Sequence, residues 1–240
     1  MRILVLSDIH ANWPALCAVF SHEQDFDACL VAGDLVDYAT GARDVIAWVR
    51  ENADGVVRGN HDHAVAQFIQ PSQPESSFKL LRNETRNYHW DSLSQRDLNY
   101  LAQLPLSLEI ELDGLRFYLI HASPRDPLNE YLPNVSEVWE ERLKEIDADI
   151  ICVGHTHFPY ICKLTDKQVL NPGSVGQPRD GDPRASYAII ENGEIQLKRI
   201  EYDIDKTIDQ MTKAGLCKEA IQAAKRILSS GSTEVRKKNE

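Results

Sequence analysis

The sequence is poor in several features that mark special classes of protein. It has only five cysteines among 240 residues, an odd number without a C-x-x-C pair. A disulfide-stapled secreted fold and a thiolate zinc site are therefore excluded. No apolar run reaches the roughly 18–20 residues of a membrane-spanning helix. Glycine (12 residues) follows no period, and we find no internal repeat or low-complexity block, so collagen, coiled coil and wholesale disorder are excluded as well.

Positive charge is also scarce. Lysine and arginine number 26 against 37 acidic residues, which gives a net charge of −11. This balance repels nucleic acid polymers and anionic lipid surfaces, so we expect neither a membrane partner nor a long DNA or RNA substrate. Met1 leads directly into a strand-like apolar run and not into a signal segment, which predicts a cytoplasmic protein. A small anionic substrate would need local positive charge.

Hydrophobic residues make up 42% of the chain, enough for a large buried core. In the first quarter, short apolar runs alternate with amphipathic stretches, as in βαβ units. We predict strands over 3–7, 28–32 and 55–57, with helices over 14–22 and 41–51. Residues 64–104 are polar with leucines at helical spacing, which predicts a helical insertion.

The second half of the chain has a different, largely antiparallel pattern. Asp113-Gly114 favours a tight hairpin turn between strands over 106–112 and 115–120. Further predicted elements are a helix over 135–146, strands over 150–153, 160–164, 169–171, 185–191 and 194–200, and helices over 204–211 and 218–228. We therefore expect an α/β (α+β) fold, a four-layer αββα sandwich of two mixed β-sheets flanked by helices. One domain would span 1–228, followed by a flexible tail over 229–240.

Five short polar motifs each follow a predicted strand. They are Asp8-Ile9-His10, Gly33-Asp34-Leu35-Val36-Asp37, Gly59-Asn60-His61-Asp62, His121 and Gly154-His155-Thr156-His157. Ligand sites in α/β sheets gather beyond the carboxyl ends of strands. Side chains two residues apart on an extended segment point the same way, so each motif can direct two groups to one point.

The side chains of these motifs are suited to binding metal ions. The candidate ligands are Asp8, His10, Asp34, Asn60, His121, His155 and His157. This set of nitrogen and oxygen donors is too large for one metal, and two metals that share one carboxylate fit it. Imidazoles and carboxylates without thiolates favour borderline divalent transition metals such as Mn, Fe, Co, Ni or Zn over Ca or Mg. The donor set does not choose among them.

In this order, the five motifs resemble those of the calcineurin-like metallophosphoesterase superfamily, and the resemblance spans residue 1 to about residue 200. The stretches 121–127, 171–179 and 182–187 resemble the branch of small single-domain prokaryotic phosphodiesterases and dinucleoside-polyphosphate hydrolases. The resemblance implies a first metal held by Asp8, His10, Asp34 and His157. It implies a second held by Asp34, Asn60, His121 and His155, with Asp34 as the bridge. A bridging hydroxide would then attack the phosphorus in line.

His61 is next to a predicted ligand but is assigned to neither metal. It is the candidate to protonate the leaving group or to stabilise charge on the phosphoryl group. Asp62 either orients His61 or begins a helix. Asp37 is interpreted as a solvated residue or one that supports a ligand.

Other polar residues near the motifs have more than one interpretation. We predict surface positions for His22, His63 and His89, which occur in polar helical contexts. Four arginines flank the motifs and either neutralise substrate phosphates or form structural ion pairs: Arg58, Arg125, Arg179 and Arg184. The turn over 171–174 is either a plain strand exit or a wall of the site. The substrate-binding residues stay unassigned.

The sequence thus predicts a metal-dependent hydrolase that cleaves a phosphodiester or pyrophosphate bond in a small phosphorylated substrate, nucleotides being one class. The alternatives are a phosphomonoesterase, including a serine/threonine protein phosphatase, and a non-catalytic protein-binding scaffold of the same fold, similar to a subunit of the retromer coat. A scaffold would be expected to lack some ligands or His61, and this chain keeps them all. The sequence leaves the oligomeric state open.

Overall fold

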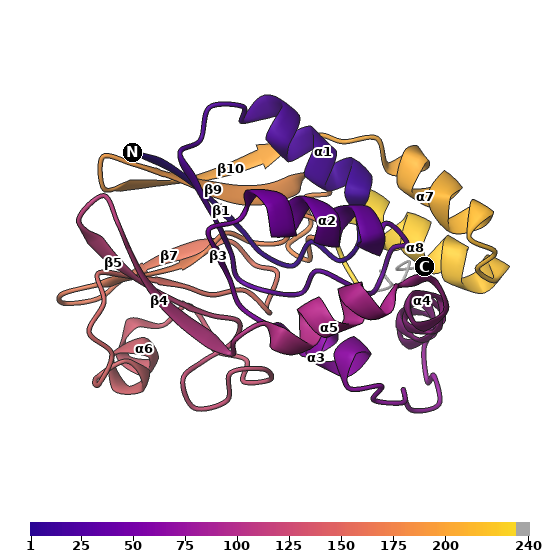
Figure 1. Cartoon of the computed structure of the whole chain (residues 1–240), viewed down its shortest axis with the longest axis horizontal. Helices are drawn as coiled ribbons and strands as arrows, with labels where there is room; N and C mark the ends of the chain where they lie inside the picture. Colours follow the sequence, from indigo (N-terminus) through magenta and orange to yellow (C-terminus); the bar gives the residue numbers. More distant parts are fainter. Residues whose placement is uncertain (234–240) are drawn as a thin grey trace, which may run out of the picture.

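Two mixed five-stranded β-sheets form the centre of the fold, which the computed structural model describes for residues 1–233 (Figure 1). The first sheet has the strand order β10-β9-β1-β2-β3 and the second the order β4-β5-β6-β8-β7. The strands of the first sheet are β1 (Arg2–Leu6), β2 (Ala28–Val31), β3 (Gly55–Val56), β9 (Ala185–Glu191) and β10 (Glu194–Ile200). Those of the second are β4 (Ser107–Leu112), β5 (Leu115–Ile120), β6 (Ile150–Cys152), β7 (Tyr160–Lys163) and β8 (Gln168–Asn171).

The alternation of side chains along β1 explains how the layers stack. Ile3 and Val5 are buried in the core between the two sheets, where Phe117 and Leu119 of β5 also lie. Leu4 and Leu6 point to the opposite face and belong to a second core that packs against helices. Because both faces of β1 are buried, the strand reads as a continuous apolar run.

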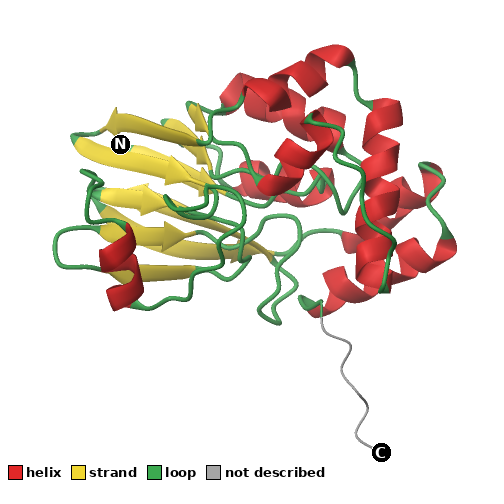
Figure 2. Ribbon diagram, turned by 90° about the horizontal axis from the view of Figure 1, so that it is seen from below, coloured by secondary structure: helices red, strands yellow, loops and turns green. Residues whose placement is uncertain are grey.

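Helices cover the outer face of each sheet. The core on the outer face of the first sheet contains residues of α1 (Trp13–His22) and α2 (Ala42–Asn52). On the second sheet, α6 (Ser136–Arg142) supplies the buried Trp139, and Figure 2 shows this short helix lying apart from the other helices. The predicted αββα sandwich is therefore confirmed. Helix α6 ends at Arg142, four residues before the predicted end.

A separate group of helices lies at one end of the sandwich (Figure 1). The predicted insertion is helical and contains α4 (Ser77–Ser92) and α5 (Gln95–Gln103), which follow α3 (Asn60–Ala66). A further apolar core joins α4 to α7 (Ile204–Lys213) and α8 (Lys218–Ser230). The first residues of the predicted tail continue α8, and Gly231 is buried. The remainder of that tail, from residue 234, lies outside the described residues.

Within residues 1–233, no helix is both long enough and apolar enough to cross a membrane.

Candidate metal centre

The seven predicted ligands all lie in segments that follow strand ends. In the first sheet, Asp8 and His10 follow β1, Asp34 follows β2 and Asn60 follows β3. In the second sheet, His121 comes directly after β5, and the Gly-His-Thr-His segment with His155 and His157 follows β6. Since the two sheets pack face to face, the loops of both meet at one edge of the sandwich.

The backbone of these loops is unusual. Five of the seven residues have a positive φ, between 50° and 65°: Asp8, His10, Asp34, His155 and His157. Non-glycine residues rarely adopt this left-handed conformation, and it concentrates at functional sites. The motifs are therefore tight turns and not the extended segments that we expected.

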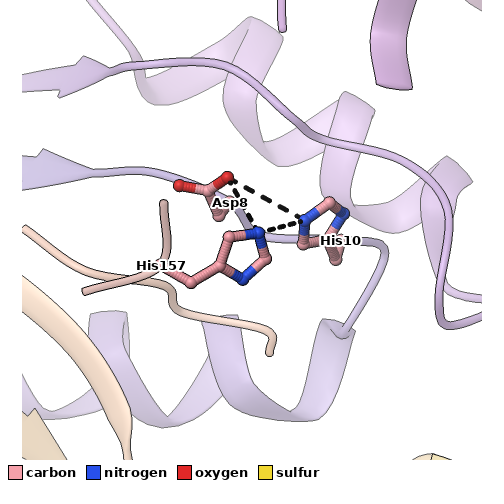
Figure 3. Close-up of side chains that lie close together, drawn as sticks. All are labelled: Asp8, His10 and His157. Atoms are coloured by element: carbon pink, nitrogen blue, oxygen red, sulfur yellow. Dashed lines mark hydrogen bonds and ion pairs between the residues drawn. The ribbon is translucent and has the colours of Figure 1, made fainter. Parts of the chain in front are cut away.

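Asp8, His10 and His157 form the first group of candidate ligands (Figure 3). The Nε2 atoms of the two imidazoles are 3.2 Å apart, and Asp8 Oδ1 is 3.3 Å from His157 Nε2. Each ring donates its Nδ1 proton to a backbone carbonyl, at Val36 (2.9 Å) and at Gln177 (2.6 Å). Both Nε2 atoms therefore present lone pairs to one another, an arrangement that a shared cation stabilises.

The second group surrounds Asn60. Its Oδ1 is 3.2 Å from His121 Nε2 and 3.1 Å from His155 Nδ1. Asp34 Oδ2 is 3.3 Å from His121 Nε2 and 3.8 Å from His10 Nε2, so this carboxylate lies between the two groups. His121 Nδ1 donates to the carbonyl of Ala32 (2.7 Å), so Nε2 is the ring nitrogen that faces Asp34 and Asn60.

The cluster has the properties of a site built for cations. Asp8 Oδ1 and His155 Nε2 are buried without a hydrogen-bond partner among the described residues. Burial lowers the pKa of His10 to about 3, so its imidazole is neutral, as a metal ligand must be. Burial also disfavours the charged form of His121, but Asp34 outweighs it and raises the pKa to about 9. The cluster around Asp34 thus attracts positive charge, and its nitrogen and oxygen donors fit divalent transition metals.

A buried triad of Asp37, His61 and Arg86 lies beside this cluster. His61 Nδ1 donates to Asp37 Oδ2 over 2.6 Å, and Arg86 of α4 pairs with the same oxygen, its Nε at 3.1 Å. Burial opposes ionisation of Asp37, yet the hydrogen bond and charge of His61, with Arg86, lower its pKa to about 2. Asp37 is therefore not solvated; it has the supporting role of the two that were expected, and the residue that it orients is His61.

Asp62 has the other of its two expected roles. Its carboxylate accepts the backbone N–H groups of Gly59 (3.0 Å), Asp34 (2.8 Å) and Leu35 (2.8 Å). It therefore caps the start of α3 and fixes the turn that carries Asp34. The same close packing excludes a side chain at Gly59, where a Cβ would come within 2.0 Å of Asp34 Oδ1.

The surface prediction is wrong for His89. Its side chain is fully buried, and its Nε2 accepts the backbone N–H of Asp37 over 3.0 Å. The polar context of α4 misled the prediction, because this helix turns a polar face to the buried loop that contains Asp37. His22 is 59% exposed, as predicted, and His63 is half-buried.

The turn over 171–174 supports the loops that carry the candidate ligands. Asn171 Nδ2 donates to the carbonyl of Gly154 (2.7 Å), and Ser174 Oγ donates to the carbonyl of Asp8 (2.7 Å). A Cβ on Gly154 would lie 1.9 Å from Ser7 Oγ. These contacts fix the backbone on both sides of the first group of ligands.

A cavity of about 210 Å³ opens onto the cluster. It is lined by Asp34, Tyr38, Asn60, His61, Phe78, Arg82, Tyr131, His155, His157 and Arg179. Of the four flanking arginines, Arg125 and Arg184 pair with the carboxylates of Glu130 and Asp182. Arg58 donates to the carbonyl of Ala102. Arg179 lines the cavity, and so does Arg82 of α4, which the motifs gave no reason to suspect.

Comparison with known proteins gives a consistent result. The calcineurin-like phosphoesterase superfamily domain matches residues 1–194. The crystal structure of a metallophosphoesterase from Sphaerobacter thermophilus is 32% identical, covers 96% of this chain and 99% of its own, and superposes with a TM-score of 0.80. The uncharacterized protein MJ0912 of Methanocaldococcus jannaschii is 29% identical over 88% of this chain and 92% of its own length. Phosphodiesterase YfcE of Escherichia coli is 25% identical over 80% of this chain and 88% of its own length. With the fold, the five motifs and these matches in agreement, the chain belongs to the calcineurin-like phosphoesterase superfamily.

Proposed function

We propose that the chain is a metal-dependent phosphodiesterase that hydrolyses a phosphodiester or pyrophosphate bond in a small substrate. One observation carries the proposal: seven candidate ligand side chains lie together next to a histidine–carboxylate pair, and four of the seven line a single cavity. The family and the relatives named phosphodiesterase and metallophosphoesterase support it.

The two groups of ligands would each hold one divalent ion. Asp8, His10 and His157 belong to the first ion, and Asn60, His121 and His155 to the second. The position of Asp34 between His10 and His121 supports its role as the shared carboxylate. When bound, two such ions acidify a water molecule and neutralise the phosphoryl oxygens.

His61 would supply the proton that the leaving group needs. Its Nδ1 is occupied by Asp37, so Nε2 is the ring nitrogen that remains for the substrate in the cavity. In this proposal Asp37 holds the ring in one orientation and stabilises its protonated form, as a carboxylate partner does for a catalytic histidine. Arg86 keeps Asp37 ionised and in place. His61 is 7% exposed, so little water competes for the proton.

The test is hydrolysis of bis-p-nitrophenyl phosphate and of p-nitrophenyl phosphate by chelator-stripped protein. Mn, Fe(II), Co, Ni and Zn are then added back one at a time. We expect no turnover without metal, recovery with at least one ion, and a higher kcat/KM for the diester. Asp34→Asn should abolish the recovery. Asp166→Asn, an exposed carboxylate on a turn, is the matched control and should behave as the wild type.

Two results would contradict the proposal. A higher kcat/KM for the monoester would favour a phosphomonoesterase. Failure to bind any of the five metals would favour a protein-binding scaffold. Metal content by mass spectrometry of the native protein distinguishes the second case from a poor choice of substrate.

A further inference from the structure

Among residues 1–233, two arginines in the cavity have no carboxylate partner. Arg82 comes from α4 and Arg179 from the segment that follows the turn over 171–174, and both line the cavity with His61 and His157. Both are half-buried. No ion pair to Asp or Glu forms at either guanidinium within residues 1–233, whereas the neighbouring Arg86 is neutralised by Asp37.

Neutral amides hold both guanidinium groups in place. Nε and Nη2 of Arg82 donate to Asn83 Oδ1, at 3.2 and 2.9 Å. Nε and Nη2 of Arg179 donate to Gln177 Oε1, at 3.3 and 3.0 Å. Asn83 is itself fixed, because its Nδ2 donates to the carbonyl of Ser72. Each arginine is therefore oriented while no described carboxylate compensates its positive charge, and its remaining N–H groups have no partner among residues 1–233 and can donate to an anion.

An aromatic pair supports the position of Arg179. Tyr38 and Phe78 stack with their centroids 5.0 Å apart. The guanidinium carbon of Arg179 is 5.4 Å from the centre of the Phe78 ring and 5.9 Å from that of Tyr38. Cations favour the faces of aromatic rings. The residues around the arginine thus stabilise its charge without cancelling it.

The charge balance points to the ligand. Two divalent ions in the proposed centre would already neutralise the phosphoryl group that reacts. Two further cations at the same cavity match additional negative charge, in a protein whose net charge is −11. We propose that Arg82 and Arg179 form a subsite for a second phosphate group of the substrate, adjacent to the group that is cleaved.

The inference rests on the proposed function and names the substrate class as an organic diphosphate or a longer polyphosphate. A cavity of about 210 Å³ accommodates a phosphate head but is smaller than the roughly 300–1,000 Å³ of sites that enclose a whole drug-sized ligand. The organic part of the substrate would extend beyond the cavity mouth, past the exposed Tyr131, which is 62% accessible.

The experiment measures binding and does not depend on turnover. Thymidine 5′-diphosphate and thymidine 5′-monophosphate are titrated calorimetrically into Mn-loaded protein at one fixed free Mn concentration. We expect the diphosphate to bind at least about 10-fold more tightly, since its second phosphate would accept charge-assisted hydrogen bonds from the two arginines. Arg82→Gln and Arg179→Gln should each remove roughly 10-fold of the diphosphate affinity and change monophosphate affinity less than about 3-fold. Arg226→Gln, an exposed arginine on α8, is the charge-matched control and should change neither.

Two outcomes overturn the inference. One is equal affinity of the wild-type protein for the two nucleotides. The other is an equal loss for both nucleotides in the variants, which would assign the arginines to the reacting phosphate. Arg82→Lys and Arg179→Lys keep the charge and should retain part of the preference, so a variant that folds poorly does not decide the result. The proposed function is scored separately, by metal content and by the ratio of diester to monoester turnover: failure to bind metal or a preference for the monoester contradicts that function, whereas loss of the diphosphate preference with metal bound contradicts the subsite alone.

Discussion

At the scale of single residues, His61 and Asp37 form one hydrogen-bonded pair. They are joined by a 2.6 Å hydrogen bond in a buried setting, although 23 residues separate them in the chain. A histidine that donates a proton to a leaving group matters most when that group is a poor one, because a good leaving group departs without protonation.

We therefore predict that His61→Ala retains its metals but loses turnover in proportion to the pKa of the leaving group. The loss should be roughly 100- to 10,000-fold for an alkyl alcohol and much smaller for p-nitrophenol. Asp37→Asn should show the same dependence on the leaving group. The double variant should lose little beyond His61→Ala, since residues that act as one unit are not additive. The measurement is kcat/KM across a series of thymidine 5′-phosphate esters.

An equal loss for all esters would show that His61 stabilises charge on the phosphoryl group instead. Additive losses in the double variant would show that Asp37 acts independently of His61.

The residues of the candidate site could be predicted from the sequence largely because they lie in motifs. Residue type, order and placement after strands identified the seven residues that the structure brings together. The carboxylate partner of His61 could not be identified from the sequence alone, because the adjacent Asp62 was as good a candidate as the distant Asp37. The fold decides: α3 directs Asp62 to backbone N–H groups at its own start.

At the scale of elements, α4 is the helix that the sequence described least well. It was expected as part of an insertion of unknown role. Three of its residues contact a single loop, two of them adjacent and the third one turn further along: Thr85 Oγ1 accepts the N–H of Tyr38, Arg86 pairs with Asp37, and His89 accepts the N–H of Asp37. No motif marks these residues. Positions three and four apart lie on the same face of a helix, but the sequence does not show which part of the fold that face contacts. The insertion thus anchors the loop that orients His61.

His89 makes this anchor sensitive to acid. Burial lowers its pKa to about 4, from 6.5 in an unfolded chain. Between these values the unfolded chain binds a proton that the folded protein excludes, so the free energy of unfolding decreases as the pH falls from 6.5 to 4. The contribution is at most about 1.4 kcal/mol per pH unit. His89→Gln keeps an acceptor without titrating and should make the pH dependence shallower by this amount.

Urea unfolding at pH 4.5, 5.5 and 6.5 checks this prediction. His22→Gln, at a position that is 59% exposed, is the control and should leave the slope of stability against pH as it is in the wild type. An unchanged slope in His89→Gln would show that His89 does not link the helix to acid stability.

The ends of elements were predicted less well than their existence. The hairpin of β4 and β5 follows the prediction closely because Asp113-Gly114 fixes its turn, with both residues at positive φ. Helix α6 is shorter than predicted because Leu143 and Ile146 belong to the apolar core beyond its end and not to a further helical turn. Periodic apolar residues indicate burial, and residues in a loop can be buried just as residues in a helix can.

At the scale of the whole molecule, the packing between the two sheets holds the two halves of the site at a fixed separation. Leu119 of β5 is fully buried in this core, with Ile3 and Val5 of β1 in the same cluster. We predict that Leu119→Ala lowers the free energy of unfolding by about 2–5 kcal/mol, because the cavity it leaves is only partly filled. Urea unfolding with an unchanged m value would confirm the loss.

Leu197→Ala is the matched control, since Leu197 lies on the edge strand β10 and is 38% exposed. Its cost should stay below about 1 kcal/mol. Equal costs for the two variants would mean that the core between the sheets contributes no more than the surface.

The distribution of the ligands along the chain has a consequence for biosynthesis. The cluster needs residues from Asp8 to His157, and β1, which leads to the first of them, pairs on one side with β9, so that Arg2 lies opposite Glu191. A nascent chain emerging from the ribosome therefore contains Asp8 and His10 long before the other candidate ligands exist. In the proposed centre, metal capture would become possible only after His157 has been translated, and a truncated chain that stops before residue 157 would lack a complete first group of candidate ligands.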